Sequence, residues 1–264
     1  MAACMSQDEP ADEIPAATLI VFRNARTYEN RPEILMVERS RELAFAGGAV
    51  VFPGGRVDLA DRQLAAQMRH YFADEDEAAH RIAAIRETLE ETGLAIGLRG
   101  QIDGQNAVEA RNLLLEREEL APVLKCFGWS LDLDALTPFA RWLPRGMTHA
   151  RIFDTRFYLA DLGTGAVEVE VDATENTRLF WTSAKEALAS IERGDIKAIF
   201  PTIRNLERLA QFDTYEDALA QTRSIPTRII TPQIVENEAG RWLTIDDDLG
   251  YPVTREPLGK TRRE

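Results

Sequence analysis

Cysteine and histidine are scarce in this chain of 264 residues: Cys4 and Cys126 are the two cysteines, and the three histidines are His70, His80 and His149. Two such cysteines provide no disulfide framework and no thiolate metal site. No two histidines stand at the spacing of zinc ligands. We therefore exclude disulfide-rich scaffolds and zinc centres as the basis of function.

Positive charge is also in short supply, because 31 Lys and Arg face 44 Asp and Glu for a net charge of −13. Such a surface repels a nucleic-acid backbone, so no nucleic-acid partner is expected. An anionic small molecule can still be held through bridging metal ions and a few arginines. No segment approaches 18 apolar residues, and the first 15 residues contain no basic stretch followed by an apolar run. We expect no membrane contact and a cytoplasmic location.

The length and the hydrophobic fraction of 45% suit one large domain, or a domain with an appendage. We expect a disordered tail over 1–13, a main domain over 14–222 with an inserted segment at 62–85, and a β-rich extension over 223–264. No repeat or linker divides the chain further.

Strands alternate with helices along the main domain, an order that suits an α/β/α sandwich with a mixed sheet. Ser183 with Glu186 three residues later predicts a helix start. Strands are expected at 16–22, 34–37, 49–52, 139–143, 152–159, 166–171, 177–181, 228–234 and 241–245. Helices are expected at 62–71, 75–92, 106–120, 183 onward, 201–212 and 214–222.

The most informative segment begins with Phe52-Pro53-Gly54-Gly55 and ends with Arg86-Glu87-Thr88-Leu89-Glu90-Glu91-Thr92-Gly93-Leu94. Three glutamates at i, i+3 and i+4 share one face of a helix, close enough to share hard cations. Gly93 predicts the end of that helix, so the acids crowd its last turn. The helix dipole and mutual repulsion both disfavour this, by roughly 0.3–1 kcal/mol each. A local rule broken in this way indicates a functional site.

A solvated acidic helix face with a glycine cap is the alternative for this string. The preceding Pro-Gly-Gly favours the functional interpretation, because such a bend brings backbone close to whatever lies against the helix.

The segment resembles the Nudix box, G-x5-E-x7-R-E-U-x-E-E-x-G-U, in which U is aliphatic. Gly55 matches the first glycine, and Arg86 through Leu94 match the closing half. There are three departures: Asp61 stands where the box has Glu, Thr88 takes an aliphatic position, and residues 62–85 stand where the box has seven residues.

The resemblance implies a Nudix-type α/β/α sandwich and a hydrolase of diphosphates that uses Mg²⁺ or Mn²⁺. Carboxylates and backbone carbonyls are the ligands such cations prefer. By resemblance, the metal would be held by Glu87, Glu90, Glu91 and the Gly54 carbonyl, and Arg86 would keep these carboxylates in register. We predict Glu175 as a further ligand or general base, although a plain acidic loop residue is nearly as good an interpretation. Asp61 occupies the position of a helper acid.

The segments 35–40, Gly48, 52–55, Trp142-Leu143-Pro144 and 151–157 are similar to the coenzyme A and acyl-coenzyme A diphosphatase branch. That resemblance implies cleavage to 3′,5′-ADP and (acyl-)phosphopantetheine, with Arg39 and Gly55 contacting substrate. Arg39 in a solvated loop is an equal alternative.

Within the same chemistry, ADP-ribose or NADH is the second substrate hypothesis, and it would be favoured by aromatic residues that stack on adenine. A nucleotide sensor without activity is a third hypothesis, disfavoured because the box glutamates are kept. A homodimer is the assembly that the resemblance implies.

Overall fold

The structure is a computed structural model that describes residues 13–23, 32–40, 46–68, 70–145, 151–162, 176–238 and 240–261. The strand expected at 166–171 and the candidate Glu175 lie outside the described residues. None of the helices in the described ranges combines the length and apolar character needed to span a bilayer.

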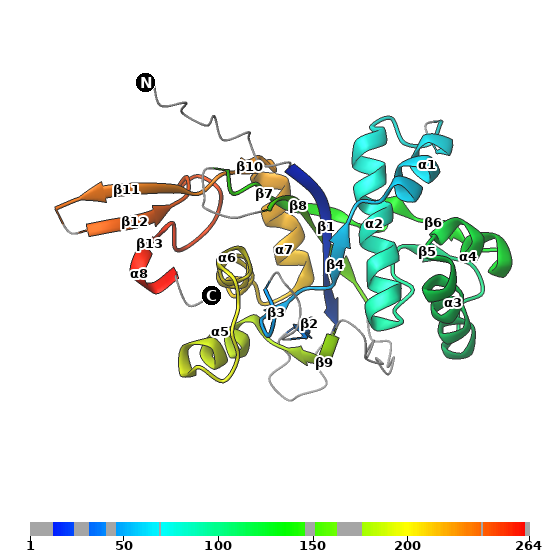
Figure 1. Ribbon diagram of the computed structural model, residues 1–264, viewed down its shortest axis with the longest axis horizontal. Helices are drawn as coiled ribbons and strands as arrows, with labels where there is room; N and C mark the ends of the chain where they lie inside the picture. Colours follow the sequence, from blue (N-terminus) through cyan, green and yellow to red (C-terminus); the bar gives the residue numbers. More distant parts are fainter. Residues whose placement is uncertain are drawn as a thin grey trace, which may run out of the picture.

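Eight of the described strands form a mixed sheet at the centre of the molecule (Figure 1). Strand β1 (Glu13–Arg23) is parallel to β8 (Ile152–Asp161), and β7 (Thr137–Trp142) joins β8 to β10 (Ile229–Ile230). On the other side of β1 the sheet continues through β2 (Glu33–Arg39), which pairs with β9 (Asn176–Thr182). The short strands β3 (Val50–Val51) and β4 (Gly54–Arg56) pair with β2 and β1 respectively.

Helices cover both faces of this sheet (Figure 1). Alternation along β1 puts Leu19 and Val21 in one core and Ile20 and Phe22 in the other. The first core is covered by α1 (Leu59–Gln67), α2 (Glu75–Thr92), α3 (Gly104–Arg117) and α4 (Leu120–Phe127). The second is covered by α5 (Ala184–Arg193), α6 (Phe200–Leu209) and α7 (Tyr215–Ser224). The predicted α/β/α sandwich with a mixed sheet is confirmed.

Smaller elements complete the described chain. Strands β5 (Leu98–Arg99) and β6 (Ser130–Leu131) pair beside α3 and α4, and the 3₁₀ turn η1 (Leu133–Ala135) follows them. Strands β11 (Gln233–Asn237), β12 (Gly240–Thr244) and β13 (Arg255–Pro257) form a separate sheet that stands away from the sandwich, with α8 (Leu258–Thr261) beside it (Figure 1). Strands β11 and β12 pair as a hairpin that closes between Asn237 and Gly240.

The residues after position 222 also reach the central sandwich. Strand β10 extends the main sheet, and Tyr251 is 5% exposed within the second core. The Tyr251 hydroxyl donates to Asn205 Oδ1 at 2.8 Å and accepts from Trp142 Nε1 at 3.2 Å. The boundary between residues 222 and 223 stays a prediction, and any domain division there must allow for these contacts.

Glu207 on α6 gives a testable pH dependence of stability. Burial raises its pKa to about 7, with Arg204 opposing the rise and Glu256 adding to it. In the unfolded chain a glutamate titrates near pH 4.3, so between these values the folded state holds an extra proton. Stability therefore falls as the pH rises through this window and is level above it.

Glu207→Gln removes that titration. The parent chain loses stability between pH 5 and pH 8 and the variant does not. We therefore expect the difference in unfolding free energy, variant minus parent, to rise by roughly 1–3 kcal/mol from pH 5 to pH 8, since one pKa unit is worth about 1.4 kcal/mol. Urea unfolding of both proteins at the two pH values measures the difference. Parallel pH dependences for the two proteins would contradict the assignment.

Candidate metal-binding site at the end of helix α2

Helix α2 is bounded by the signals that its sequence carries. Asp74 is the N-cap and its carboxylate accepts from the Glu77 N–H at 3.0 Å, while Gly93 ends the helix in the left-handed region at φ 73°. An apolar stripe at helical spacing along α2 is fully buried against the sheet; it consists of Ala78, Ile82, Ile85 and Leu89. This packing orients the opposite side of the last turn, with Glu87, Glu90 and Glu91, toward β4.

The two glycines of the box lie against those glutamates. We expected a turn at this point, but after a bend at Pro53 both glycines belong to strand β4, which pairs with β1. The Gly54 N–H donates to Glu91 Oε2 at 3.0 Å, and a Cβ on Gly55 would lie 2.2 Å from Glu87 Oε1. A Cβ on Gly54 would lie 2.4 Å from the Ala17 carbonyl oxygen. Only glycine allows both approaches, because each contact is shorter than a side chain permits.

Arg86 lies among the carboxylates of the box and is 3% exposed. Its Nη1 lies 3.0 Å from Glu87 Oε1 and 3.4 Å from Glu90 Oε2. Its Nε and Nη2 form a two-pronged pair with Asp61, each at 3.0 Å, and Nη2 also donates to the Arg56 carbonyl at 2.9 Å. Burial alone would lower the pKa of Arg86, but Glu87 and Asp61 outweigh burial and raise it. The guanidinium therefore stays charged and joins α1, α2 and β4.

Asp61 is placed by helix α1. Helix α1 starts at Leu59, so Asp61 lies in its first turn, where its Oδ2 accepts from the Asp58 N–H at 2.9 Å. The same carboxylate is 2% exposed and faces Arg86. The shorter acid of this box thus reaches Arg86 from the first turn of α1, a helix that continues into the insertion.

The ion pair of Arg86 with Asp61 predicts that Asp61 and Asp58 contribute very differently to stability. Asp61→Asn leaves buried Arg86 without its two-pronged partner, and we expect a loss of about 2–4 kcal/mol in unfolding free energy. Asp58→Asn is the matched control, because Asp58 Oδ2 also lies 3.2 Å from Arg86 but its side chain is 54% exposed. The control should cost less than about 1 kcal/mol. Chemical denaturation measures both, and equal losses would contradict the role given to Asp61.

The carboxylates of the box repel one another. Burial raises the pKa of Glu87 to about 8; Arg86 opposes the rise, and Glu91 and Glu90 add to it. Arg86 therefore does not neutralise the acids crowded into this last turn. A divalent cation would relieve the excess negative charge.

The donor set fits Mg²⁺ or Mn²⁺ by type, since every side chain involved offers carboxylate oxygen. Its arrangement is held by the protein's own groups: Glu87 and Glu90 face Arg86, and Glu91 faces the Gly54 N–H. In the described ranges no three acidic, histidine or cysteine side chains are gathered tightly enough around one point to hold an ion. Metal ligation by these glutamates stays a prediction, and it requires Glu87 and Glu90 to share their oxygens with the ion as well as with Arg86.

Arg111 was not predicted from the sequence as a residue of this region. Arg111 of α3 is 7% exposed, and its Nε donates to the Glu90 carbonyl at 2.8 Å. Its Nη2 lies 3.5 Å from the Glu91 carbonyl. The available signal was its place on the buried face of α3, where its neighbours are Ala107, Ala110 and Leu114. An arginine on an apolar stripe breaks the local pattern in the same way as the glutamates do.

The predicted substrate contact Arg39 lies at the end of β2, opposite Asn176 of β9. A bulge between Glu38 and Arg39 interrupts the pairing there. Its side chain is partly buried, and its Nε has no hydrogen-bond partner among the described residues. Glu175, the candidate base, is outside the described residues, although it directly precedes Asn176 in the chain.

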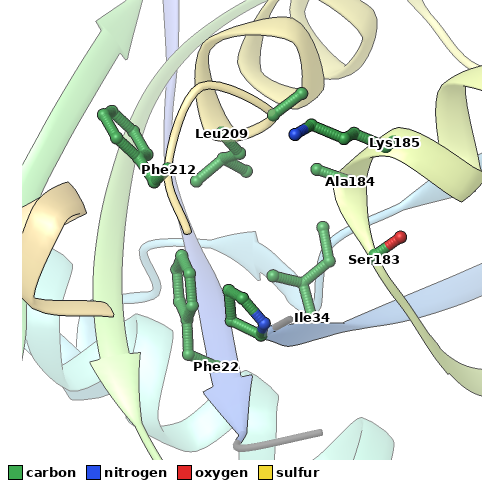
Figure 2. Close-up of a pocket in the computed structure, with 9 residues that line it drawn as sticks. Phe22, Ile34, Ser183, Ala184, Lys185, Leu209 and Phe212 are labelled. Atoms are coloured by element: carbon green, nitrogen blue, oxygen red, sulfur yellow. The ribbon is translucent and has the colours of Figure 1, made fainter. Parts of the chain in front are cut away.

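A pocket with about 320 Å³ of empty space, part of it open to solvent, lies on the other face of the sheet (Figure 2). Apolar side chains line most of it, and Ser183 and Lys185 at the start of α5 border it (Figure 2). The remaining lining residues are Phe22, Pro32, Ile34, Ala184, Leu209, Ala210 and Phe212. It borders the second core, whereas the box helix covers the first, so this pocket is separate from the carboxylates.

The comparisons with known proteins agree with this fold. No family model matches the chain. The protein named acyl-coenzyme A diphosphatase NUDT19 from Gallus gallus is 28% identical over 70% of this chain, and its namesake from Xenopus laevis is 26% identical over 73%. The chain spans 63% of the length of each of these relatives.

Among solved structures, a NUDIX hydrolase from Alicyclobacillus acidocaldarius is similar to this chain with a TM-score of 0.68 and 28% identity. The match covers 80% of this chain and 96% of that protein. The box, the sandwich and these relatives together show that the chain resembles the Nudix hydrolases, and among them the acyl-coenzyme A diphosphatases.

Proposed function

We propose that this chain hydrolyses the diphosphate of coenzyme A or acyl-coenzyme A, using Mg²⁺ or Mn²⁺. The observation that carries the proposal is the packing of Glu87 and Glu91 onto the two box glycines, at the end of a helix where Glu87 and Glu90 also face Arg86. The names of the two relatives supply the substrate class.

The reaction adds water to one phosphorus and breaks the bridging P–O bond, which gives 3′,5′-ADP and (acyl-)phosphopantetheine. A diphosphate resists this attack because its negative oxygens repel an incoming nucleophile. When bound, a divalent cation would neutralise those oxygens. Glu87, Glu90, Glu91 and the Gly54 carbonyl would hold it, and Glu175 is our candidate to take the proton from water.

Two arginines have different parts in this proposal. Arg86 is buried among carboxylates and holds them in place, so it is not free to bind substrate. Arg39 has an Nε donor without a partner in the described chain. It lies at the end of β2, opposite the first residue of β9. A phosphate oxygen would satisfy that donor.

Hydrolysis of ADP-ribose or NADH is the second candidate reaction. It would be favoured by an exposed aromatic side chain that can stack on adenine. Three large aromatic residues of the main domain, candidates for that role, are core residues: Trp129 is 5% exposed, Trp142 1% and Phe157 6%. This placement removes their support for the alternative, and because coenzyme A also carries adenine, the preference for coenzyme A rests on the names of the two relatives.

A substrate panel tests the proposal. The purified chain is incubated with coenzyme A, acyl-coenzyme A, ADP-ribose or NADH, each with Mg²⁺, with Mn²⁺ or with a chelator, and the products are identified by mass spectrometry. We expect 3′,5′-ADP from the first two substrates, dependent on the metal. Faster release of AMP from ADP-ribose or NADH would replace our substrate assignment, and tight nucleotide binding without any product would indicate a sensor.

A further inference from the structure

Arg111 connects helix α3 to the last turn of α2, outside the box. It lies on the buried stripe of α3, yet its guanidinium turns to the end of a neighbouring helix. A Cβ on Gly93 would lie 3.7 Å from Arg111 Cδ, so the arginine stem packs directly on the residue that ends α2.

The groups that Arg111 contacts belong to the predicted ligand residues themselves. The last four carbonyls of a helix have no partner within the helix. Leu89 O is taken by the Gly93 N–H at 2.9 Å, and Arg111 donates to the next carbonyl, Glu90 O, while its Nη2 lies near Glu91 O. Arg86 holds the side chains of this turn, and Arg111 holds its backbone.

The charge of Arg111 also has the right sign for its place. The C-terminal end of a helix is its negative end, and here it also carries the acids of the box. A buried cation bonded to the terminal carbonyls reduces the negative potential at that end. It leaves the carboxylate oxygens available for a divalent ion, because it uses backbone oxygens as acceptors.

We propose that Arg111 is a positioning residue for the divalent cation: it fixes the backbone of Glu90 and Glu91 and offsets the helix dipole beneath the ligand set. This inference rests on the proposed metal-dependent function. It predicts that loss of Arg111 weakens metal binding more than it changes the reaction at saturating metal.

The experiment compares Arg111→Gln, Arg111→Lys and the parent chain. The control is Arg117→Gln on the same helix, because the Arg117 side chain is 56% exposed and forms its ion pair with its neighbour Glu116. Binding of Mn²⁺ without substrate is followed by the electron paramagnetic resonance signal of the free ion. The Mg²⁺ dependence of turnover and the circular dichroism spectrum are recorded for each protein.

For Arg111→Gln we expect the Mn²⁺ dissociation constant to rise about 10- to 100-fold, the range found when groups that orient metal ligands are removed. Turnover at saturating Mg²⁺ should stay within a few-fold of the parent, with half-saturation at higher Mg²⁺. Arg111→Lys should recover part of the affinity, and Arg117→Gln should match the parent chain.

Unchanged Mn²⁺ affinity in folded Arg111→Gln, with normal binding by the parent, would overturn this proposal alone. If Arg111→Gln fails to fold, the lysine variant decides, because it keeps a charge but cannot reach both carbonyls in the same geometry. Absence of Mn²⁺ binding by the parent chain would overturn the metal site and this proposal together.

Discussion

Replacing Glu91 with glutamine should lower metal-dependent turnover by roughly two to three orders of magnitude while the protein stays folded. Metal ions contribute several kcal/mol to such reactions, and each 1.4 kcal/mol is worth about a factor of ten. Glutamine has the shape of glutamate and keeps an oxygen that can accept from the Gly54 N–H, now at 3.0 Å from Glu91 Oε2. It loses the negative charge that a divalent cation requires.

The removal of that charge should also leave stability intact or improve it slightly. Glu91 is 5% exposed and is among the carboxylates that raise the pKa of Glu87, so its neutralisation relieves repulsion in the last turn of α2. The measurements are turnover against Mg²⁺ concentration, Mn²⁺ binding and thermal unfolding of the same preparation.

Glu116→Gln makes the same chemical change on the outer side of α3, where the side chain is 66% exposed, and should behave as the parent chain. A folded Glu91→Gln protein with turnover near that of the parent would refute the ligand assignment. A protein that loses structure would instead show that Glu91 serves the fold through its bond to strand β4.

Helix α2 could be predicted to the residue because its determinants are local. A capping aspartate, a stripe at helical spacing and a closing glycine all lie within one stretch of sequence. The capping serine of α5 was predictable for the same reason, since Ser183 accepts from the Glu186 N–H three residues later at 3.2 Å.

The partners of this helix end that lie outside the helix could not be predicted, because they come from elements that only the fold brings together. Asp61 reaches Arg86 across 25 positions of sequence, and Arg111 reaches Glu90 across 21. Neither pairing leaves a periodic trace, and the register of β4 on β1 depends on how the whole sheet assembles. The sequence therefore predicted the acids as candidates and, by resemblance, Arg86 as the residue that keeps them in register, and it left open the parts of Asp61 and Arg111.

The double glycine illustrates the same limit from the side of the backbone. We expected it to form a turn near the helix, and closeness to the helix was the correct part of that expectation. Pairing of Thr18 with Gly54 and of Ala17 with Gly55 makes it a strand instead. The need for glycine comes from the Glu87 carboxylate against Gly55 and the Ala17 carbonyl against Gly54. These contacts form only in the folded chain and cannot be read from the sequence.

Gly55→Ala should reduce turnover by about 100-fold with only a modest loss of stability, because displacement of a reacting group by 1 Å can cost that much. The new Cβ would lie 2.2 Å from Glu87 Oε1 and 2.7 Å from Oε2, so the carboxylate must move. The carboxylate is the far end of a flexible side chain, which allows the fold to survive with a cost of roughly 1–2 kcal/mol.

Gly104→Ala is the control. A Cβ added at Gly104 would have no neighbouring atom within 4 Å, so this variant should be neutral. Turnover and denaturant unfolding are measured for both variants. Full activity of Gly55→Ala would mean that the position of the Glu87 carboxylate against strand β4 does not matter for the reaction, and the proposed site would have to be sought elsewhere.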